Sequence, residues 1–387
     1  MSKVSIIIPT LNRAQLLRFA LKSAVEQDYQ DLEIVVCDDF SDDNTSEVVE
    51  SLDDKRIIYI RTDERLNMPD TFEFALSKAN GEYITFLTDT CYLLPKCISK
   101  AMEELKKFNS HLVMWKNCIY IGKDWFEIQR KNTLYLSKFT NKSDFLNSKE
   151  YLKRFYNNIR EPIIPKSINS LCHRSIIEKA ITKQGRFFLY PIPDHTSAAT
   201  LLANTENFVF IDQPLFVAGL TSFNIGASQS FNLGKSAQDF LKGFEGKKME
   251  EIAFLGIYTT ASLIIKGLEN VRRFYPDCPE INMKNALLEI VDSLSKLKVY
   301  GAQGIENYWK IFDDYVERYH KNLKTEIFLK KIKSFLKWKG VKIIRSNRFF
   351  HNFESIIRGM KILRGEKYGF NNIEEAAKVV DAFNKQK

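Results

Sequence analysis

The chain has 387 residues, of which 44% are hydrophobic and 27% are charged, and its formal net charge is +9. This is the composition of an ordinary globular protein, and the length favours two domains over one. We expect no signal peptide and no membrane-spanning segment, and the six scattered cysteines argue against both a disulfide framework and a zinc site. A cytoplasmic protein is therefore expected.

Residues 1–120 alternate between short apolar runs and amphipathic stretches, which predicts a largely parallel sheet with flanking helices. The predicted strands lie at 4–8, 33–37, 56–60 and 81–87, and the predicted helices at 14–27, 42–52, 69–79 and 95–107.

The next part of the chain is mixed, and the last part is helical. We predict helices over 148–156, 173–182 and 194–204, a short strand over 185–188, and last strands over 208–211 and 215–218. From about Ser236 the pattern is helical to the end, and Gly, Ser and Asn concentrate between Gly226 and Ser236. The sequence thus predicts domains of residues 1–228 and 229–387.

Three of the predicted strands deliver polar residues at their carboxyl ends. These are Pro9–Arg13 after the first strand, Asp38–Thr45 after the second and Thr88–Thr90 after the run at 81–87. Ligands of open α/β sheets bind at this edge, so we expect a nucleotide-type site there.

Val4–Arg13, Glu33–Thr45 and Gly81–Pro95 together resemble the nucleotide-sugar-binding half of family 2 glycosyltransferases, which have the GT-A fold. That family commonly shows P-T-x-N-R, then D-D-x-S-x-D-x-T, then G-E-Y-[IV]-x-F-L before an acidic turn. The resemblance covers roughly residues 3–220. It implies an α/β domain with a Rossmann-like mixed sheet, followed here by an all-helical C-terminal domain.

The resemblance also implies a binding site for the nucleotide of a sugar donor. Pro9, Thr10 and Asp39 would line a uridine pocket, where a carboxylate accepts the base N3–H. Asn12 and Arg13 lie at a helix start, where N–H groups favour phosphate. The whole nucleotide-binding set is Pro9, Thr10, Asn12, Arg13, Asp38, Asp39, Asp70, Thr88 and Asp89. The alternative is that Asp38 and Asp39 are turn residues and Asp70 is a helix cap.

The acidic turn departs from the family pattern, in which L-x-D-D-D-x-x-x-P holds Mn²⁺ or Mg²⁺ against the diphosphate. Here Asp89 keeps its carboxylate, but Thr90 replaces the expected metal ligand and no histidine follows the last strand. Hard divalent ions prefer several oxygen ligands. Three outcomes stay open: a weak metal site on Asp89, a metal-free enzyme, or a degenerate one.

Asp194 matches the position at which the family places its general base. Inverting transfer needs a group that deprotonates the acceptor hydroxyl as the oxygen attacks the anomeric carbon. The alternative role of Asp194 is a plain helix N-cap.

Residues 321–348 contain eight Lys and two Arg against Glu326, interleaved with large apolar residues. A basic amphipathic helix of this kind suits an anionic membrane surface, although a helix packed on its own domain would look similar. No nucleic-acid module accompanies the patch, so we expect no nucleic-acid partner.

The resemblance implies an inverting glycosyltransferase that moves a sugar, UDP-linked by the family pattern, to a hydroxyl of a growing capsule, lipopolysaccharide or similar surface glycan. The expected partners are the donor, a glycan or lipid-linked acceptor, the inner face of the plasma membrane, and a second copy of the chain. The alternative is a degenerate GT-A protein that binds nucleotide or acts as a scaffold in glycan assembly. A nucleotidyltransferase is less well supported, because the Gly-rich phosphate loop with its Lys is missing.

Overall fold

The computed structural model describes residues 2–222, 240–346 and 360–385. In these residues the strands form one eleven-stranded sheet in the order β11-β7-β6-β9-β4-β1-β2-β3, and β10 pairs with β5, β6 and β8. Their bounds are β1 Val4–Thr10, β2 Leu32–Asp38, β3 Ile57–Arg61, β4 Tyr83–Phe86, β5 Tyr92–Leu93, β6 Leu112–Ile121, β7 Thr133–Ser137, β8 Ser143–Asn147, β9 Ser170–His173, β10 Asn207–Leu220 and β11 Met360–Arg364.

The helices of the first 222 residues are α1 Ala14–Val25, α2 Thr45–Glu50, α3 Met68–Ser77, α4 Cys97–Phe108, α5 Ser148–Asn157, α6 Arg174–Gln184 and α7 Pro193–Ala203, with short 3-10 turns η1 at Ile128–Arg130 and η2 at Ser167–Asn169. The later helices are α10 Met249–Ile252, α11 Thr260–Phe274, α12 Met283–Tyr300, α13 Ile305–Tyr319, α14 Lys324–Ser346, α16 Gly365–Tyr368 and α17 Ile373–Lys385, with η3 at Phe254–Gly256 and η4 at Lys321–Leu323.

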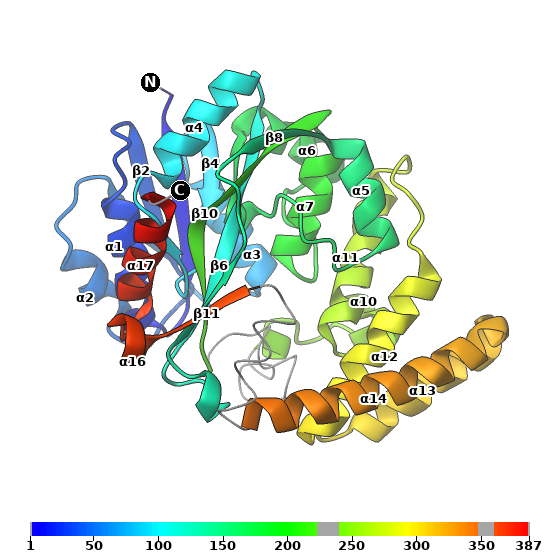
Figure 1. Cartoon of the computed structure of the whole chain (residues 1–387). Helices are drawn as coiled ribbons and strands as arrows, with labels where there is room; N and C mark the ends of the chain where they lie inside the picture. The colour runs from blue at the N-terminus through cyan, green and yellow to red at the C-terminus, as the bar shows by residue number, and fades with distance from the viewer. Residues whose placement is uncertain (1, 223–239, 347–359, 386–387) are drawn as a thin grey trace.

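The parallel strands β4, β1, β2 and β3 lie side by side, and β3 is the edge strand at this end of the sheet. The inner strands β1 and β2 are covered on both faces. All residues of β1 and β2 are buried, which explains their unbroken apolar runs. Ile6 and Ile8 pack in one core with α1 and α4, whereas Ile7 faces a second core with α3. Figure 1 shows α1 and α2 on one side of the sheet and α3, α6 and α7 on the other. The predicted α/β fold is confirmed.

The predicted helical part is present from Met249 to Ser346. Its helix α11 packs on α7, α12 packs on α11, and α14 runs along α12. The predicted boundary between Gly226 and Ser236 lies outside the described residues, so the division at residue 228 stays a prediction.

The all-helical prediction is wrong for the end of the chain. Met360–Arg364 form β11, which pairs antiparallel with β7 at the edge of the sheet. After β11, α17 packs against β10 and α1, and Lys22 forms an ion pair with Glu374. A five-residue strand is too short for its periodicity to stand out beside long helices, and its partner strand lies more than 200 residues away.

The predicted strand at Gly185–Phe188 is also wrong. The segment is a series of bends, and the Glu73 carboxylate of α3 accepts the backbone N–H groups of Phe187 and Phe188 at 2.8–3.0 Å. A side chain therefore satisfies the donors that a neighbouring strand would otherwise take.

Candidate active site

The strands that carry the predicted site are direct neighbours. β1 pairs parallel with β2 on one side and with β4 on the other, and the register sets Pro9 opposite Cys37 and Thr10 opposite Asp38. The ends of these strands therefore meet at one edge of the sheet, as the sequence pattern predicts.

Thr10, Arg13 and Asp89 form the centre of this edge. The Thr10 hydroxyl donates to Asp89 Oδ2 at 3.0 Å, and Arg13 Nη1 lies 3.1 Å from Asp89 Oδ1. The Asp89 side chain is only 2% exposed and the Arg13 side chain 22%. Asp89 is thus a buried carboxylate balanced by a guanidinium that still reaches solvent.

Asn12 joins the loop after β1 to the loop after β2. Its backbone is left-handed with φ 51°, its N–H donates to the Ser41 hydroxyl, and its side-chain oxygen accepts from Asp42 N–H at 2.7 Å. Ala14 N–H, at the start of α1, donates to Asp43 Oδ2 at 2.9 Å. One donor at the predicted phosphate site is therefore already bound to a carboxylate of the chain.

The two adjacent aspartates of the second motif have different surroundings. Asp38 is fully buried, and it accepts from Tyr59 Oη at 2.7 Å and from Ser41 N–H at 2.9 Å. Burial is the largest cause that raises the pKa of Tyr59 to about 12, and the hydrogen bond to Asp38 is the second. These contacts favour a structural role for Asp38.

Asp39 is the better candidate of the pair for contact with the base. Its Oδ1 accepts from Leu66 N–H at 2.8 Å, and its backbone N–H donates to the Thr10 carbonyl. Burial raises the pKa of the carboxyl, against hydrogen bonds from Leu66, Thr71 and Thr62 that act to lower it. A carboxylate has about four acceptor positions, and the donors from Leu66, Thr62 and Thr71 leave room for one more.

The donor set of the turn after β4 does not fit a divalent metal ion. Thr88, Thr90 and Cys91 contact one another through hydroxyl and thiol groups, and burial raises the pKa of the Cys91 thiol. Asp89 is the one carboxylate of the turn, and both of its oxygens already have partners. Within the described part of the chain, no group of three or more His, Cys, Asp or Glu side chains could hold a metal. A hard ion would have to displace Arg13 and would gain one carboxylate.

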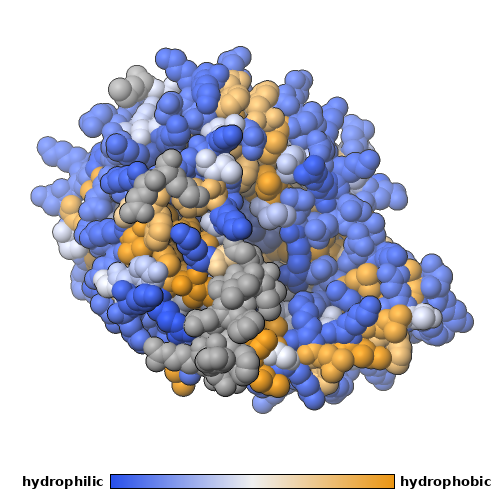
Figure 2. Space-filling model, viewed as in Figure 1, coloured by the Kyte–Doolittle hydropathy of each residue, from blue (hydrophilic) through white to orange (hydrophobic). Residues whose placement is uncertain are grey.

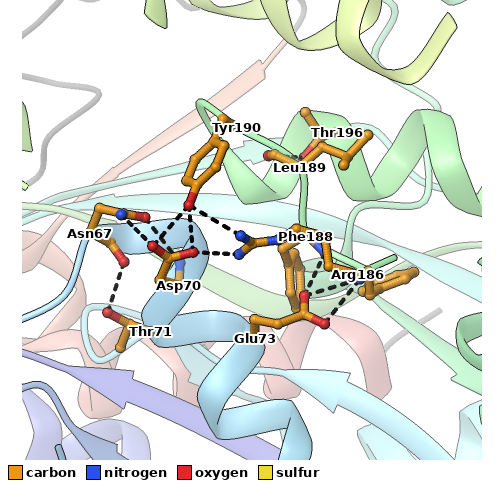
Figure 3. Close-up of polar contacts among 10 residues, drawn as sticks. Asn67, Asp70, Thr71, Glu73, Arg186, Phe188, Leu189, Tyr190 and Thr196 are labelled. Atoms are coloured by element: carbon orange, nitrogen blue, oxygen red, sulfur yellow. Dashed lines mark hydrogen bonds and ion pairs between the residues drawn. The ribbon is translucent and has the colours of Figure 1, made fainter. Parts of the chain in front are cut away.

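The structure places Asp70 in a polar cluster between α3 and the segment before α7 (Figure 3). Asp70 accepts from Arg186 Nη2 at 2.6 Å, from Tyr190 Oη at 2.8 Å and from Asn67 Nδ2 at 2.5 Å. Asn67 is the N-cap of α3, and its side-chain oxygen accepts from Asp70 N–H. Asp70 therefore joins distant segments, which favours a structural role over nucleotide binding.

Asp194 lies at the start of α7 beside two groups that can donate to it. Lys166 Nζ is 3.4 Å from Asp194 Oδ2, and His195 Nδ1 is 3.0 Å from Asp194 Oδ1. Lys166 Nζ is also 3.0 Å from His195 Nε2. Because an ammonium group only donates, Nε2 accepts from it and the ring donates through Nδ1 to Asp194.

These contacts keep Asp194 ionised. Burial acts to raise the pKa of the Asp194 carboxyl, but His195 and Lys166 outweigh it and hold that pKa well below the usual range. Lys166 immediately precedes η2, which contacts both β4 and α7 and so links Asp194 to the sheet. Sequence reasoning missed Lys166, because a single lysine 28 residues before Asp194 carries no local signal.

Residues 5–161 match the sequence model of a family described as Glycosyl transferase family 2. A GalNAc(5)-diNAcBac-PP-undecaprenol beta-1,3-glucosyltransferase of Campylobacter jejuni is 34% identical over 180 residues, which cover 41% of this chain and 57% of that protein. A UDP-Glc:alpha-D-GlcNAc-diphosphoundecaprenol beta-1,3-glucosyltransferase of Escherichia coli is 34% identical over 128 residues, covering 32% of this chain and 49% of that protein. The chain thus spans about half the length of these curated relatives.

Among solved structures, S. aureus TarS 1-349 in complex with UDP-GlcNAc is similar with a TM-score of 0.48 and 15% sequence identity. The similarity covers 92% of each chain.

Proposed function

We propose that this chain, whose residues 5–161 match the model of Glycosyl transferase family 2, is an inverting glycosyltransferase of bacterial surface-glycan synthesis. Its donor would be a UDP-linked sugar. Its acceptor would be a sugar hydroxyl on a lipid-linked glycan, a choice supported by the undecaprenol-linked substrates in the names of two relatives. The reaction would take place in the cytoplasm at the inner face of the plasma membrane.

The observation that carries the proposal is the convergence of Thr10, Arg13 and Asp89 at the carboxyl edge of the sheet. In our proposal the base lies against Pro9, Thr10 and Asp39, and its N3–H donates to the Asp39 carboxylate. The diphosphate follows toward Arg13, whose guanidinium can donate two parallel hydrogen bonds to phosphate oxygens. No step needs a metal ion, consistent with the donor set of the turn.

Asp194 is the proposed general base. The acceptor oxygen attacks the anomeric carbon, the bond from that carbon to the diphosphate oxygen breaks, and UDP leaves with the bonding electrons. The hydroxyl proton passes to Asp194, which its neighbours keep ionised before the reaction. Lys166 and His195 fix the direction of the carboxylate and so act as positioning residues.

The test is transfer from a panel of UDP-sugars to diphospholipid-linked sugar acceptors, followed by UDP release and by mass analysis of the product. Asp194→Asn should lower the rate by about 10²–10⁴-fold, the usual contribution of a general base. Asp314→Asn, an exposed position on α13, is the matched control and should leave the rate unchanged. Undiminished turnover in Asp194→Asn would refute the mechanism, and nucleotide binding without transfer to any acceptor would favour the scaffold alternative.

A further inference from the structure

The helix α14 has a fixed inner face. Ile327 and Ser334 are buried, the Ser334 hydroxyl donates to Asp292 of α12 at 3.0 Å, and Lys337 Nζ forms an ion pair with the same carboxylate. These contacts hold α14 against α12 and determine which of its side chains point outward.

The outer face of α14 is a stripe of large apolar side chains. Phe328 is 61% exposed, Leu329 49%, Ile332 44% and Leu336 63%. At roughly 3.6 residues per turn these positions share one side of the helix, opposite the buried face. Figure 2 shows apolar surface along the course of α14, interrupted and bordered by hydrophilic surface. Large apolar side chains gathered on one exposed helix face indicate an interaction site.

Exposed lysines surround this stripe. By helical position Lys333 and Lys342 border it on its two sides, and Lys339 lies within it. The whole of α14 contains seven Lys and one Arg against Glu326. Lys324, Lys331 and Lys337 form ion pairs with carboxylates of neighbouring elements, and Lys342 donates to the Val299 carbonyl. The exposed Lys333 and Lys339 therefore favour an occupant that offers negative charge beside an apolar layer.

We propose that the outer face of α14 lies on an anionic lipid bilayer, with the apolar stripe at the boundary between headgroups and acyl chains and the lysines against lipid phosphates. The charge decides against a second copy of the chain, because a symmetric pairing of two such faces would bring lysine rows together. Within the described ranges, no helix is long and apolar enough to cross a membrane. The proposed contact of α14 with the bilayer does not depend on the transferase activity.

The test is co-sedimentation of the full chain with vesicles of phosphatidylcholine, with and without phosphatidylglycerol. We expect binding to the anionic vesicles that weakens as salt is raised. Ile332→Glu/Leu336→Glu should lower the partition coefficient at least tenfold, and Lys333→Gln/Lys339→Gln should reduce binding and its salt dependence. The matched control is Ile181→Glu/Phe274→Glu, which changes two exposed apolar residues outside α14 and should bind like the unaltered chain.

Two results of the vesicle assay would overturn the proposal: equal binding to neutral and anionic vesicles, or unchanged binding of Ile332→Glu/Leu336→Glu. A third would be that the unaltered chain forms a dimer that does not bind vesicles and that Ile332→Glu/Leu336→Glu dissociates. Circular dichroism and UDP titration on each variant show whether it is folded and whether its nucleotide site is intact. A variant that loses vesicle binding but keeps UDP binding would show that α14 contacts lipid independently of the nucleotide site. A failure of the membrane proposal can therefore be told apart from a failure of the proposed transferase function.

Discussion

Asp70 can be tested as a structural group rather than a nucleotide ligand by the substitution Asp70→Asn. The change keeps the shape of the side chain and one acceptor oxygen, but it removes the negative charge that faces Arg186 and Tyr190. A hydrogen bond to a charged group contributes about 1.5–3 kcal/mol. The Asp70 and Arg186 side chains are 30% and 25% exposed, so solvent partly screens the pair. We therefore expect Asp70→Asn to lower the free energy of unfolding by about 2 kcal/mol.

The assay pairs urea unfolding, followed by tryptophan fluorescence, with calorimetric titration of UDP. Asp70→Asn should lower the free energy of unfolding by the stated amount while the UDP dissociation constant stays within about threefold, a change below 1 kcal/mol. Tyr190→Phe should lower the free energy of unfolding by about 1 kcal/mol. The double variant should lose less than the sum of the two single losses, because Asp70 and Tyr190 share one hydrogen bond. Unchanged stability together with a tenfold or greater loss of UDP affinity would refute the reasoning and make Asp70 a ligand of the nucleotide.

Three further predictions concern the site itself. Gly219→Ala should lower both the thermal midpoint and the UDP affinity, because the new Cβ would overlap the Thr90 carbonyl oxygen. The matched control Gly340→Ala, in open space within α14, should instead raise the free energy of unfolding by about 0.5–1 kcal/mol. Equal effects of the two substitutions would contradict this explanation. Arg13→Ala should weaken UDP binding at least tenfold and uridine binding much less, whereas EDTA should leave calorimetric UDP binding unchanged; a requirement for Mn²⁺ would show that the donor set was misjudged. Because the pKa of Asp194 is lower in the folded chain than in the unfolded chain, its ionised carboxylate stabilises the fold at pH values above the unfolded pKa of about 4. This stabilisation decreases as the pH falls below that value, so the difference in thermal midpoint between the unaltered chain and Asp194→Asn should shrink from pH 7 to pH 3. A difference that grows over this range would mean that the sign assigned to the pKa shift is wrong.

The sequence predicts the centre of the site well, because that centre is built from local patterns. The apolar runs that become β1 and β2 end at polar residues, and parallel pairing of neighbouring strands brings those ends together. Thr10 and Asp89, 79 residues apart, therefore meet as their positions in the sheet predict. Their roles in binding stay predictions.

What the sequence does not predict depends on tertiary contacts between segments without a repeating pattern. Lys166 reaches Asp194 only because η2 lies between β4 and α7. Asp70 contacts Arg186, which lies 116 residues later in the sequence. The alternative prediction, that Asp70 is a helix cap, accounts only for contacts within its own turn. The pairing of β11 with β7 likewise joins segments more than 200 residues apart, and no local periodicity encodes it.

The replacement at Thr90 and the pairing of Arg13 with Asp89 have a common electrostatic explanation. Each carboxylate of a metal site adds negative charge, which a divalent ion must balance before it can attract a diphosphate. Here the turn keeps one carboxylate, and the single positive charge of Arg13 already balances it. At this turn a divalent ion would meet one carboxylate that is already paired, whereas in our proposal the diphosphate would meet a guanidinium that is still partly exposed. In our proposal Arg13 then contacts the phosphate groups in place of a metal ion.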